Sequence, residues 1–424
     1  MRYEKLHIAH YTNVYKPLKN GVVTSVESFR KGQMEQGHAV YVVAPSPQDK
    51  SYVQERFVFN IAAVTLPTQS YPFALPYDPT LTRVLKGIQP DILHTHHPVG
   101  LGRFARSWSE RLRVPLVFTF HTWYEDFSHY FSRYLPFVSE EQVAGIIRFW
   151  IRKFLKRCDH VVAPSEYTRN RILDAYGDVL GGEDVSVVAT GIDTDTFSKY
   201  AKAEARSYLG WKPGQKTLVS CGRLSREKNF DLLIDAVARM EEKPRLVILG
   251  DGDLRPTLEA QVKQLGLEGL VEFPGNVEKD VVARYFAAAD LFAFASSNET
   301  QGLVVLEAMA AGTPTVVVRE GGIKDFVRDN FNGITSDNDA DSLARALERA
   351  LRIEDMEGLR ERARRTAMGL NVASQTRRLL DVYAHAMGRQ RAEREIAEFP
   401  VSSGVGFAES HPDLESAAFT QLAF

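Results

Sequence analysis

The chain has 424 residues, of which 44% are hydrophobic and 25% are charged, a balance typical of soluble globular proteins. The length predicts two or three domains, and the composition excludes a collagen, a coiled coil and a mainly disordered chain. With 52 Lys and Arg against 54 Asp and Glu, the net charge of −2 provides no overall basic field for nucleic acid or membrane. Attraction to an anionic surface would therefore require a local patch.

The N-terminus and the cysteines bear on location. The N-terminus lacks the apolar stretch of a signal peptide, and no run of about 18 apolar residues could span a bilayer. Cys158 and Cys221 match no metal-ligand spacing and indicate buried thiols in a reducing compartment. We therefore expect a cytoplasmic protein that can also lie on the inner face of the cell membrane.

Short β-rich runs recur along the chain, and helix-length amphipathic segments separate them. Most are continuous in Val, Ile, Leu and Phe, which is typical of parallel strands buried on both faces. The pattern predicts parallel α/β sheets. The expected strands are 5–11, 38–44, 91–94, 116–120, 160–163 and 186–189 in one set, and 217–221, 245–249, 271–273, 291–295 and 315–318 in a second.

The two sets predict two doubly wound, Rossmann-like domains, residues 1–195 and 196–373, divided by a polar stretch near Phe197–Gln215. A helix over 374–391 is expected to cross back to the first domain. Residues 392–424 are rich in small residues and are predicted to form a mobile tail. Carboxyl edges that face each other would form a ligand-binding cleft, which closes by a hinge near the dividing stretch and the C-terminal helix.

The segment 299–314, E-T-Q-G-L-V-V-L-E-A-M-A-A-G-T-P, follows an expected strand. A helix beginning near Gly302 would offer the N–H groups of Gly302 and Leu303 to a phosphate. Glu299 precedes this helix and Glu307 lies within it, where carboxylates suit the hydroxyls of a sugar or a ribose. A second interpretation, of about equal weight, makes Glu299 an ordinary helix N-terminal acid and Glu307 a solvated residue.

The segment 222–229, G-R-L-S-R-E-K-N, directly follows another expected strand. Its Arg223 and Lys228 would neutralise a diphosphate without a metal, although an ordinary charged loop is the alternative. Gly252 in G-D-G and Val277 in F-P-G-N-V follow the next two strands, where glycines allow a ligand to approach the backbone closely.

In the first half, K-N-G-V-V-T-S places Gly21 in a loop that opens a helix after the first strand. The missing G-x-G-x-x-G disfavours a dehydrogenase. His121, in F-T-F-H-T-W-Y, stands at the carboxyl end of a strand, which favours a functional role. Residues 94–97, H-T-H-H, have no nearby carboxylate and are interpreted as lining of the cleft rather than a metal site.

Together these motifs resemble those of the family-4 retaining glycosyltransferases of GT-B fold, over residues 5–390. The resemblance rests on the E-x7-E pair combined with G-R-L-S-R-E-K-N, G-D-G and T-G-I-D-x-x-x-F at 190–197. It implies a metal-independent, retaining enzyme with no cofactor besides a nucleotide-sugar co-substrate. The implied roles are the donor diphosphate on Arg223 and Lys228, the ribose on Glu307, and the transferred sugar on Glu299 and the Gly302 and Leu303 amides, with His121 and Gly21 nearby.

The chain departs from the family pattern in three places. Asn20 and Gly21 stand where many members have two glycines, which leaves the phosphate contacts of that loop open. Thr190 replaces a common asparagine, and Asp325 replaces a frequent glutamate. These two departures are expected to affect architecture.

The acceptor is indicated by N-G-V-V-T-S-V, H-T-W-Y-E-D-F-S-H-Y-F and E-T-Q-G-L-V, which look most like the 1,2-diacylglycerol 3-alpha-glucosyltransferase branch. A helix over 124–135 would gather Tyr124, Phe127, Tyr130, Phe131, Tyr134 and Leu135 within an arc of about 140°. This face would either line a channel for acyl chains or pack on its own domain. Tyr124 and Asp126 are the acceptor-side candidates.

The segment 146–157, I-I-R-F-W-I-R-K-F-L-K-R, divides into an apolar half and a basic half. The apolar half, Ile146 included, is expected to cover the sheet, which leaves the basic half for anionic headgroups. An ordinary solvated helix is the alternative. The candidate membrane-facing residues are Arg148, Phe149, Arg152, Lys153 and Lys156, with Arg157 adding charge.

We therefore expect a transferase that moves glucose from UDP-glucose to the hydroxyl of a membrane lipid such as diacylglycerol, with no nucleic-acid partner. A mannosyl- or N-acetylglucosaminyl-transferase with another acceptor is the alternative within the same class. A sugar-nucleotide epimerase of the same fold, or a binding module without catalysis, are the alternatives from other classes.

Overall fold

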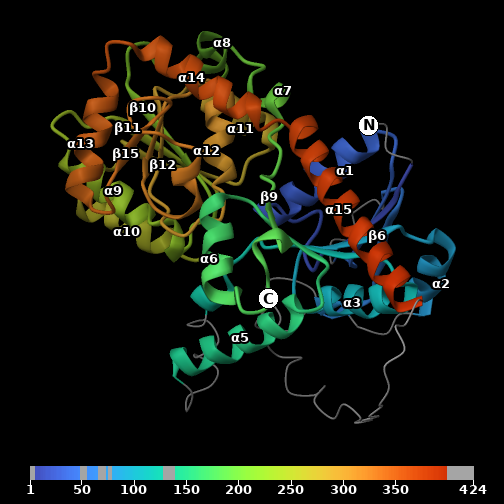
Figure 1. The fold of residues 1–424 in the computed structure, drawn as a ribbon. Helices are drawn as coiled ribbons and strands as arrows, with labels where there is room; N and C mark the ends of the chain where they lie inside the picture. Colours follow the sequence, from blue (N-terminus) through green and yellow to red (C-terminus); the bar gives the residue numbers. More distant parts are fainter. Residues whose placement is uncertain (1–4, 48–54, 65–72, 75–78, 128–138, 399–424) are drawn as a thin grey trace. The chain divides into compact units, whose positions relative to one another are not determined.

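A computed structural model describes residues 5–47, 55–64, 73–74, 79–127 and 139–398. They form two compact α/β units, each built on a parallel sheet (Figure 1). Unit 1 contains the described residues of 1–163, 169–188 and 376–398, and unit 2 contains 164–168 and 189–375. The predicted fold class of two doubly wound α/β domains is confirmed.

Unit 1 has a seven-stranded sheet in the order β3-β2-β1-β6-β7-β8-β9, and every neighbouring pair is parallel. The strands are β1 (His7–Tyr11), β2 (Ala39–Pro45), β3 (Val58–Ile61), β6 (Ile92–Thr95), β7 (Leu116–Thr119), β8 (His160–Ala163) and β9 (Val185–Val187), with a small hairpin of β4 (Ala63–Val64) and β5 (Phe73–Ala74). The helices are α1 (Gly21–Glu35), α2 (Pro79–Ile88), α3 (Leu101–Leu112), α5 (Glu140–Leu155) and α6 (Glu166–Tyr176), with short η1 (Tyr124–Phe127) and η2 (Gly182–Asp184).

Apolar clusters cover both faces of this sheet, because its strands are apolar on both sides. One cluster joins the sheet to α3, α5 and α6, and the other joins it to α15 (Val372–Glu398) (Figure 1). Leu379 and Tyr383 of α15 pack on Ile8 and Ile92 of the sheet. The C-terminal helix therefore begins in unit 2 and completes the core of unit 1.

Unit 2 has a six-stranded parallel sheet in the order β12-β11-β10-β13-β14-β15. Its strands are β10 (Thr217–Cys221), β11 (Arg245–Leu249), β12 (Val271–Gly275), β13 (Leu291–Phe294), β14 (Thr315–Val318) and β15 (Ile334–Ser336). Its helices are α7 (Thr194–Phe197), α8 (Lys202–Tyr208), α9 (Phe230–Arg239), α10 (Arg255–Gln264), α11 (Lys279–Ala288), α12 (Leu303–Ala310), α13 (Ala340–Leu351) and α14 (Met356–Gly369), with η3 (Arg226–Lys228) and η4 (Gly321–Asp325).

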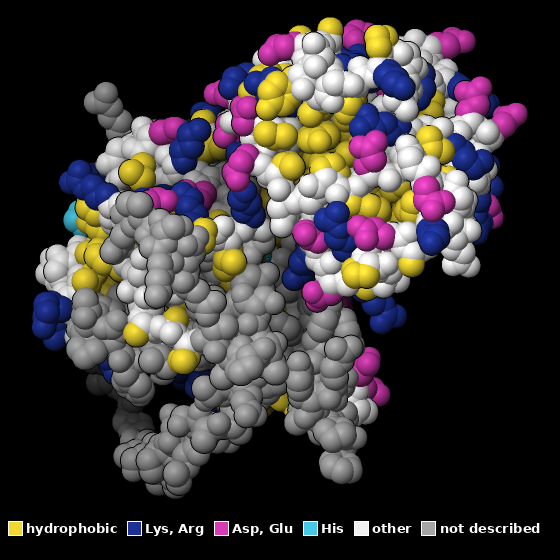
Figure 2. Space-filling model, turned by 180° about the vertical axis from the view of Figure 1, so that it is seen from behind, with side chains coloured by type: hydrophobic (Ala, Val, Ile, Leu, Met, Phe, Trp, Pro, Cys, Tyr) yellow, Lys and Arg dark blue, Asp and Glu magenta, His cyan; other side chains and the backbone are white. Residues whose placement is uncertain are grey.

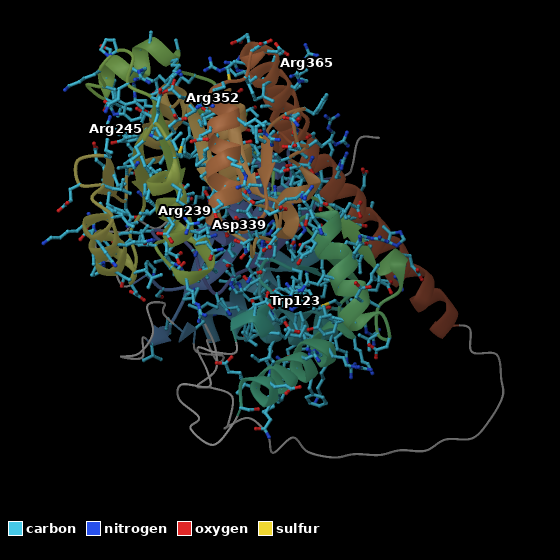
Figure 3. The ribbon with its side chains drawn as sticks, turned by 90° about the vertical axis from the view of Figure 1, so that its left-hand side faces the viewer. Trp123, Arg239, Arg245, Asp339, Arg352 and Arg365 are labelled. Atoms are coloured by element: carbon cyan, nitrogen blue, oxygen red, sulfur yellow. The ribbon has the colours of Figure 1, made fainter. Side chains whose placement is uncertain are left out.

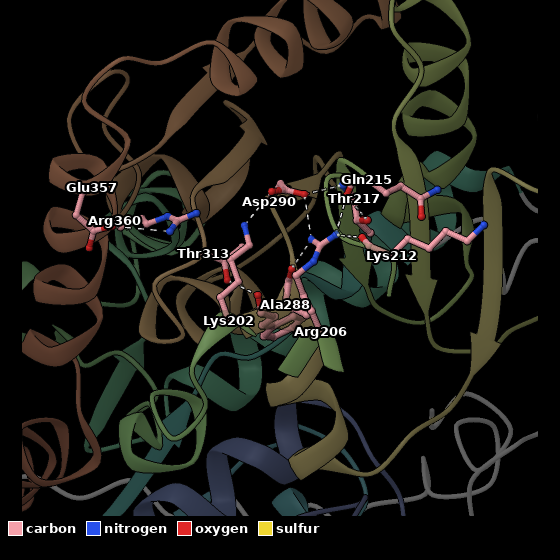
Figure 4. Close-up of polar contacts among 11 residues, drawn as sticks. Lys202, Arg206, Lys212, Gln215, Thr217, Ala288, Asp290, Thr313, Glu357 and Arg360 are labelled. Atoms are coloured by element: carbon pink, nitrogen blue, oxygen red, sulfur yellow. Dashed lines mark hydrogen bonds and ion pairs between the residues drawn. The ribbon is translucent and has the colours of Figure 1, made fainter. Parts of the chain in front are cut away.

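The stretch 197–215, predicted to divide the domains, belongs to the core of unit 2. Phe197, Tyr200 and Trp211 are buried there, and Arg206 bonds to the backbone oxygens of Ala288, Lys212 and Gln215 (Figure 4). The prediction that this stretch divides the domains was wrong, because it was based on the many polar residues and did not take account of three aromatic side chains that are buried in the core. The chain passes from unit 1 into the main part of unit 2 at residues 188–189, and it also crosses between the units at 163–164, 168–169 and 375–376.

Each sheet has one switch point, where successive strands stop adding on one side and begin adding on the other. In unit 1 it lies between β1 and β6, and in unit 2 it lies between β10 and β13. Loops at the carboxyl ends of such strands diverge, which is why open α/β sheets bind ligands there. The strand order alone therefore marks one candidate site in each unit.

Most expected strands agree with the structure within two or three residues, but β3, β4, β5 and β15 were not predicted. These strands have two to four residues, too few to show a period. The C-terminal helix continues to Glu398, past the predicted end at residue 391, because 392–398 are mostly strong helix formers. The remainder of the expected tail, 399–424, lies outside the described residues.

Charge is well mixed on the surface. Figure 2 shows Lys and Arg interspersed with Asp and Glu over the coloured part of one face, in keeping with the net charge of −2. Within the described ranges, no helix combines the length and the apolar character needed to cross a bilayer.

Candidate functional site

The switch point of unit 2 brings together Lys228 and Glu299, which are 71 residues apart in the chain. Lys228 ends η3 after β10, Glu299 lies in the loop after β13, and their side chains form an ion pair. The Lys228 ammonium also lies 5.8 Å from the centre of the Phe294 ring. The side chains of Lys228 and Glu299 are 21% and 15% exposed, so both charged groups remain partly accessible to solvent.

Arg223 is held by a carboxylate that the sequence did not single out. Its guanidinium donates to Glu227 at 2.8 Å, and the Ser225 hydroxyl donates to the same oxygen at 2.7 Å. Burial opposes ionisation of Glu227, but the bonds from Ser225, the backbone and Arg223 outweigh it and hold the pKa of this carboxyl below its usual value. Glu227 was missed because its role depends on the fold of η3.

The loop that carries Glu299 is fixed by side chains from distant segments. The Gln301 amide exchanges two hydrogen bonds with the backbone of Thr190, at 2.8 and 3.1 Å, and the Ser165 and Thr168 hydroxyls lie 2.6 and 3.1 Å from the Thr300 carbonyl. Thr190 therefore acts through its backbone. Spacing in the sequence gave no sign of these partners.

Gly302 begins the turn into α12 in the left-handed conformation, with φ of 80°. A Cβ at this position would lie 2.5 Å from Cγ1 of Ile323, so only glycine fits. The N–H groups of Leu303 and the next residues then open α12, as predicted, and give the site a partial positive charge. Asp325, near Ile323, accepts from the Tyr167 backbone at 2.7 Å, which is an architectural contact.

Glu307 lies one turn into α12 and is half-buried. Burial raises the pKa of its carboxyl to about 7, with Lys279 lowering it and Asp193 raising it. The interpretation of Glu307 as a solvated residue is therefore wrong. A carboxylate with a pKa near neutrality would gain from hydroxyl donors, because such donors stabilise its charged form.

Gly252 and Val277 have packing roles in this structure. A Cβ on Gly252 would lie 2.5 Å from the Leu224 carbonyl, so this glycine lets the loop after β11 contact the loop after β10. Val277 packs against the apolar core of unit 2.

In unit 1, Gly21 is the first residue of α1. The Asn20 side chain caps this helix by accepting from the Val23 backbone at 2.9 Å. The asparagine that replaces a family glycine therefore supplies its own oxygen at the helix N-terminus.

The switch point of unit 1 holds a group of buried histidines. His10 on β1 pairs in register with His94 on β6, and His96 follows β6. The interpretation of residues 94–97 as lining is wrong, since these histidines are inside unit 1, with exposures of 8% or less. His121, half-buried after β7, joins them through a 2.8 Å contact between its Nε2 and Nδ1 of His96.

The acceptor-side candidates lie in η1. Asp126 forms a bidentate pair with Arg171, at 2.9 and 2.6 Å. The Arg171 guanidinium lies 4.0 Å from the centre of the ring of Trp123, which is labelled in Figure 3. Tyr124 is half-buried against the core of unit 1. Residues 128–138 of the predicted aromatic helix lie outside the described residues.

The predicted membrane segment lies in α5, which a Ser139–Gln142 capping box begins. Arg148, Arg152, Lys153 and Lys156 are exposed, and Phe149 is 59% exposed. The sequence placed Ile146 against the sheet, but it is 44% exposed, because only Val143, Ile151, Phe154 and Leu155 of α5 are buried. Arg152 forms an ion pair with Asp178.

The two switch points differ in what they can bind. Cations beside a helix N-terminus in unit 2 suit a diphosphate, and the nearby carboxylates suit hydroxyl groups. Two Rossmann-like units with such a site are typical of the GT-B glycosyltransferases.

Comparisons with known proteins agree with this class. Residues 19–196 match the model of Glycosyltransferase Family 4, and residues 201–368 match that of Glycosyl transferases group 1. The chain is 30% identical over 360 residues to the alpha-monoglucosyldiacylglycerol synthase of Streptococcus pneumoniae, covering 83% of this chain and 80% of that protein. The chain therefore belongs to this glycosyltransferase family.

Another similar protein is named for a different donor sugar. A GDP-mannose-dependent alpha-(1-6)-phosphatidylinositol dimannoside mannosyltransferase of Mycobacterium tuberculosis is 28% identical over 81% of this chain and 87% of its own length. The crystal structure of Anabaena HepE with UDP and glucose has a TM-score of 0.70 at 20% identity, over 90% of this chain and 100% of that one. The latter likeness supports the fold.

Proposed function

We propose that this glycosyltransferase moves glucose from UDP-glucose to the hydroxyl of a membrane lipid such as diacylglycerol, with retention at the anomeric carbon. The observation that carries the proposal is the meeting of Lys228, Arg223 and the α12 N-terminus at one switch point. The similarity to alpha-monoglucosyldiacylglycerol synthases supports glucose and a lipid acceptor.

The donor diphosphate would exchange partners with the ion pairs of the free protein. Lys228 would leave Glu299 for a phosphate oxygen, and Arg223 would reach from Glu227 to the same group. Glu299, once released, would accept from hydroxyls of the transferred hexose, and the Gly302 and Leu303 amides would donate to its hydroxyl oxygens. Glu307 would accept from the ribose hydroxyls.

Transfer would then proceed on one face of the sugar. The bond from the anomeric carbon to the phosphate oxygen breaks while a bond to the acceptor oxygen forms, and the acceptor proton moves to an oxygen of the leaving phosphate. The charge that develops on UDP is stabilised by Lys228, Arg223 and the α12 amides, which act by preorganised electrostatics. His121 would bind a hydroxyl of the transferred hexose. Fixed cations of this kind fill the place of a divalent ion, so we propose a metal-independent reaction.

Membrane attachment forms the second part of the proposal. Exposed Ile146 and Phe149 lie on the same helix as the exposed charges of Arg148, Lys153 and Lys156. Apolar side chains among basic ones suit the surface of an anionic bilayer. Lys153 lies 5.6 Å from the Trp150 ring, which keeps its charge close to the helix.

A matrix of donors and acceptors tests the proposal. UDP-glucose, UDP-N-acetylglucosamine and GDP-mannose are each supplied with diacylglycerol vesicles or with a soluble polyol acceptor, and nucleotide release and product are measured. We expect lipid-dependent UDP release from UDP-glucose. Turnover of GDP-mannose alone would support the mannosyltransferase alternative, and conversion of the donor without UDP release would support the epimerase.

A further inference from the structure

Four side chains of unit 1 form a continuous hydrogen-bonded chain at its switch point. The Gln33 Oε1 atom lies 2.8 Å from Nε2 of His10, and Nδ1 of His10 lies 3.0 Å from Nε2 of His96. Nδ1 of His96 lies in turn 2.8 Å from Nε2 of His121. Gln33, His10 and His96 are fully buried, so this chain leads from inside unit 1 to the half-buried His121.

The Gln33 amide fixes the direction of this chain. Its Nε2 donates to the Tyr383 hydroxyl of α15 at 3.2 Å, so its oxygen faces His10. An amide oxygen can only accept, and His10 must therefore donate from Nε2. A neutral imidazole has a single N–H, so His10 accepts at Nδ1 from His96 Nε2–H. By the same rule His96 accepts at Nδ1 from His121 Nε2–H, which makes Nδ1 the acceptor of the His121 ring.

The rings have to be neutral for this alternation, because an imidazolium has two donors and no acceptor. Burial lowers the pKa of His10 to about 4 and that of His121 to about 3, and it lowers the pKa of His96 well below its usual value. The burial that lowers these pKa values also explains why both ring nitrogens of His10 and of His96 need hydrogen-bond partners.

A metal site is the alternative for this cluster. Within the described residues, His10, His94 and His96 bring candidate ligand atoms within 4.8 Å of one another. However, Nδ1 of His94 lies 2.6 Å from the Tyr383 hydroxyl, and its Nε2 lies 2.7 Å from the Thr119 hydroxyl. The His94 and His96 rings are stacked at 4.5 Å, an arrangement that accounts for the cluster by hydrogen bonds and packing.

We infer that Gln33 and His10, through His96, are positioning residues that hold His121 in its Nε2–H tautomer. This tautomer leaves Nδ1 of His121 unprotonated, so that this atom can only accept a hydrogen bond. This inference rests on the proposed role of His121 in glycosyl transfer. It adds a function for Gln33 and His10, which the sequence motifs do not include.

The first test observes the tautomers directly in the whole protein. Ring ¹⁵N NMR of histidine-labelled protein should find Nε2–H and bare Nδ1 at His10, His96 and His121. Gln33→Leu removes the amide oxygen that sets the direction of the hydrogen bonds. In this variant His121 should show a mixture of both tautomers. Gln33→Glu restores an acceptor and should restore the single tautomer. Gln36→Leu, an exposed glutamine at the end of α1, is the matched control. A His121 that carries its proton at Nδ1 in the unaltered protein would overturn the inference.

The second test asks whether Gln33 acts through His121. We expect kcat to fall about 100-fold in His121→Ala and about 10-fold in Gln33→Leu, with the donor KM little changed. In the double variant, Gln33→Leu should have no further effect, because the group that it positions is gone. Losses that multiply would mean a merely structural role. His160→Asn removes a buried histidine that is not part of this hydrogen-bonded chain, and it controls for a general loss of stability.

The outcomes separate this inference from the proposed function. If His121→Ala keeps full activity, the proposed role of His121 fails, although NMR would still report the tautomers. If the tautomers change in Gln33→Leu without any change in kcat, the inference alone fails. Stoichiometric binding of added Zn²⁺ with perturbed His10 and His96 signals would also overturn it in favour of a metal site.

Discussion

The two switch points share a topology but use opposite chemistry. Between β10 and β13, unit 2 gathers formal charges, which include the Lys228–Glu299 and Arg223–Glu227 pairs. Between β1 and β6, unit 1 gathers uncharged imidazoles that bond to one another and to Gln33. The difference shows that one sheet geometry can serve either to neutralise a charged ligand or to orient a neutral group.

Burial accounts for the difference. The charged side chains of unit 2 stand in loops beyond the strand ends, where partial exposure lets ions persist. His10 and His94 lie within the strands, where a charge would be costly and where neutral groups must be fully bonded. We expect variants in the two units to respond accordingly.

The largest effect should come from removing charge in unit 2. Lys228→Ala should lower kcat/KM by about 10²- to 10³-fold, because a preorganised cation at the diphosphate is lost. Arg223→Ala should do less, since Arg223 is 54% exposed. Steady-state kinetics with UDP-glucose measure both, with Arg239→Ala on α9 as the control for a lost surface charge. Near-native activity of Lys228→Ala would remove the assignment of the diphosphate site.

Glu307 should show a trade-off between stability and function. Its pKa in the folded protein, about 7, exceeds the ordinary value of 4.5, so the native state loses stability as pH rises between these values. Glu307→Gln should therefore stabilise the protein by up to about 3 kcal/mol above pH 7, while donor affinity falls. Urea unfolding and UDP titration at about pH 8 and about pH 5 would check this. Equal stability at both pH values would contradict the burial effect.

The histidines should give unit 1 the opposite pH dependence. His10 has a folded pKa of about 4 against 6.5 in the unfolded chain, so stability is complete above pH 6.5 and is lost as pH falls toward 4. Each such histidine contributes a slope of about 1.4 kcal/mol per pH unit in this window. Protection factors from hydrogen exchange should fall in β1 and β6 before they fall in β10 and β13. A uniform loss of hydrogen-exchange protection across both sheets would contradict the expected difference between the two units.

Charge on the surface of α5 should have a smaller effect. Lys153→Glu with Lys156→Glu should release the protein from anionic vesicles, each basic charge being worth about 1 kcal/mol and screened by salt. Arg352→Glu with Arg365→Glu gives unit 2 the same change in net charge and should have little effect on sedimentation (Figure 3). UDP affinity should survive in both variants. Unchanged sedimentation at low salt would make α5 an ordinary solvated helix.

A chelator should have the smallest effect. Lys228, Arg223 and the α12 amides already supply positive charge in unit 2, so EDTA should leave the rate of transfer nearly unchanged. Initial rates with and without EDTA, then with added Mg²⁺ or Mn²⁺, provide the check. Loss of activity that Mg²⁺ or Mn²⁺ restores would overturn the metal-independent proposal.

The sequence determined the fold class and singled out most of the candidate site residues in unit 2. Continuous apolar runs have to be buried on both faces, which fixes parallel strands between helices, and the motifs around Arg223, Lys228 and Glu299 are local in the chain. Only the tertiary structure decided what these groups contact. Glu227 and Gln301 gained their roles, and the residues of 197–215 entered the core, through contacts across long separations.

The histidine chain gives the same lesson for unit 1. The four residues of this hydrogen-bonded chain are spread over positions 10–121 and have no spacing that a motif could carry. The H-T-H-H segment indicated only His96 among them. Strand register brings His10 beside His94, and the Gln33 amide then sets the direction of every hydrogen bond that follows. The sequence thus indicated most of the strands, because the burial of a continuous apolar run depends on the residues of that run alone, whereas the short strands β3, β4, β5 and β15 were not recognisable. The partners of the polar groups were decided only by folding, because hydrogen bonding depends on atoms that the chain brings together from afar.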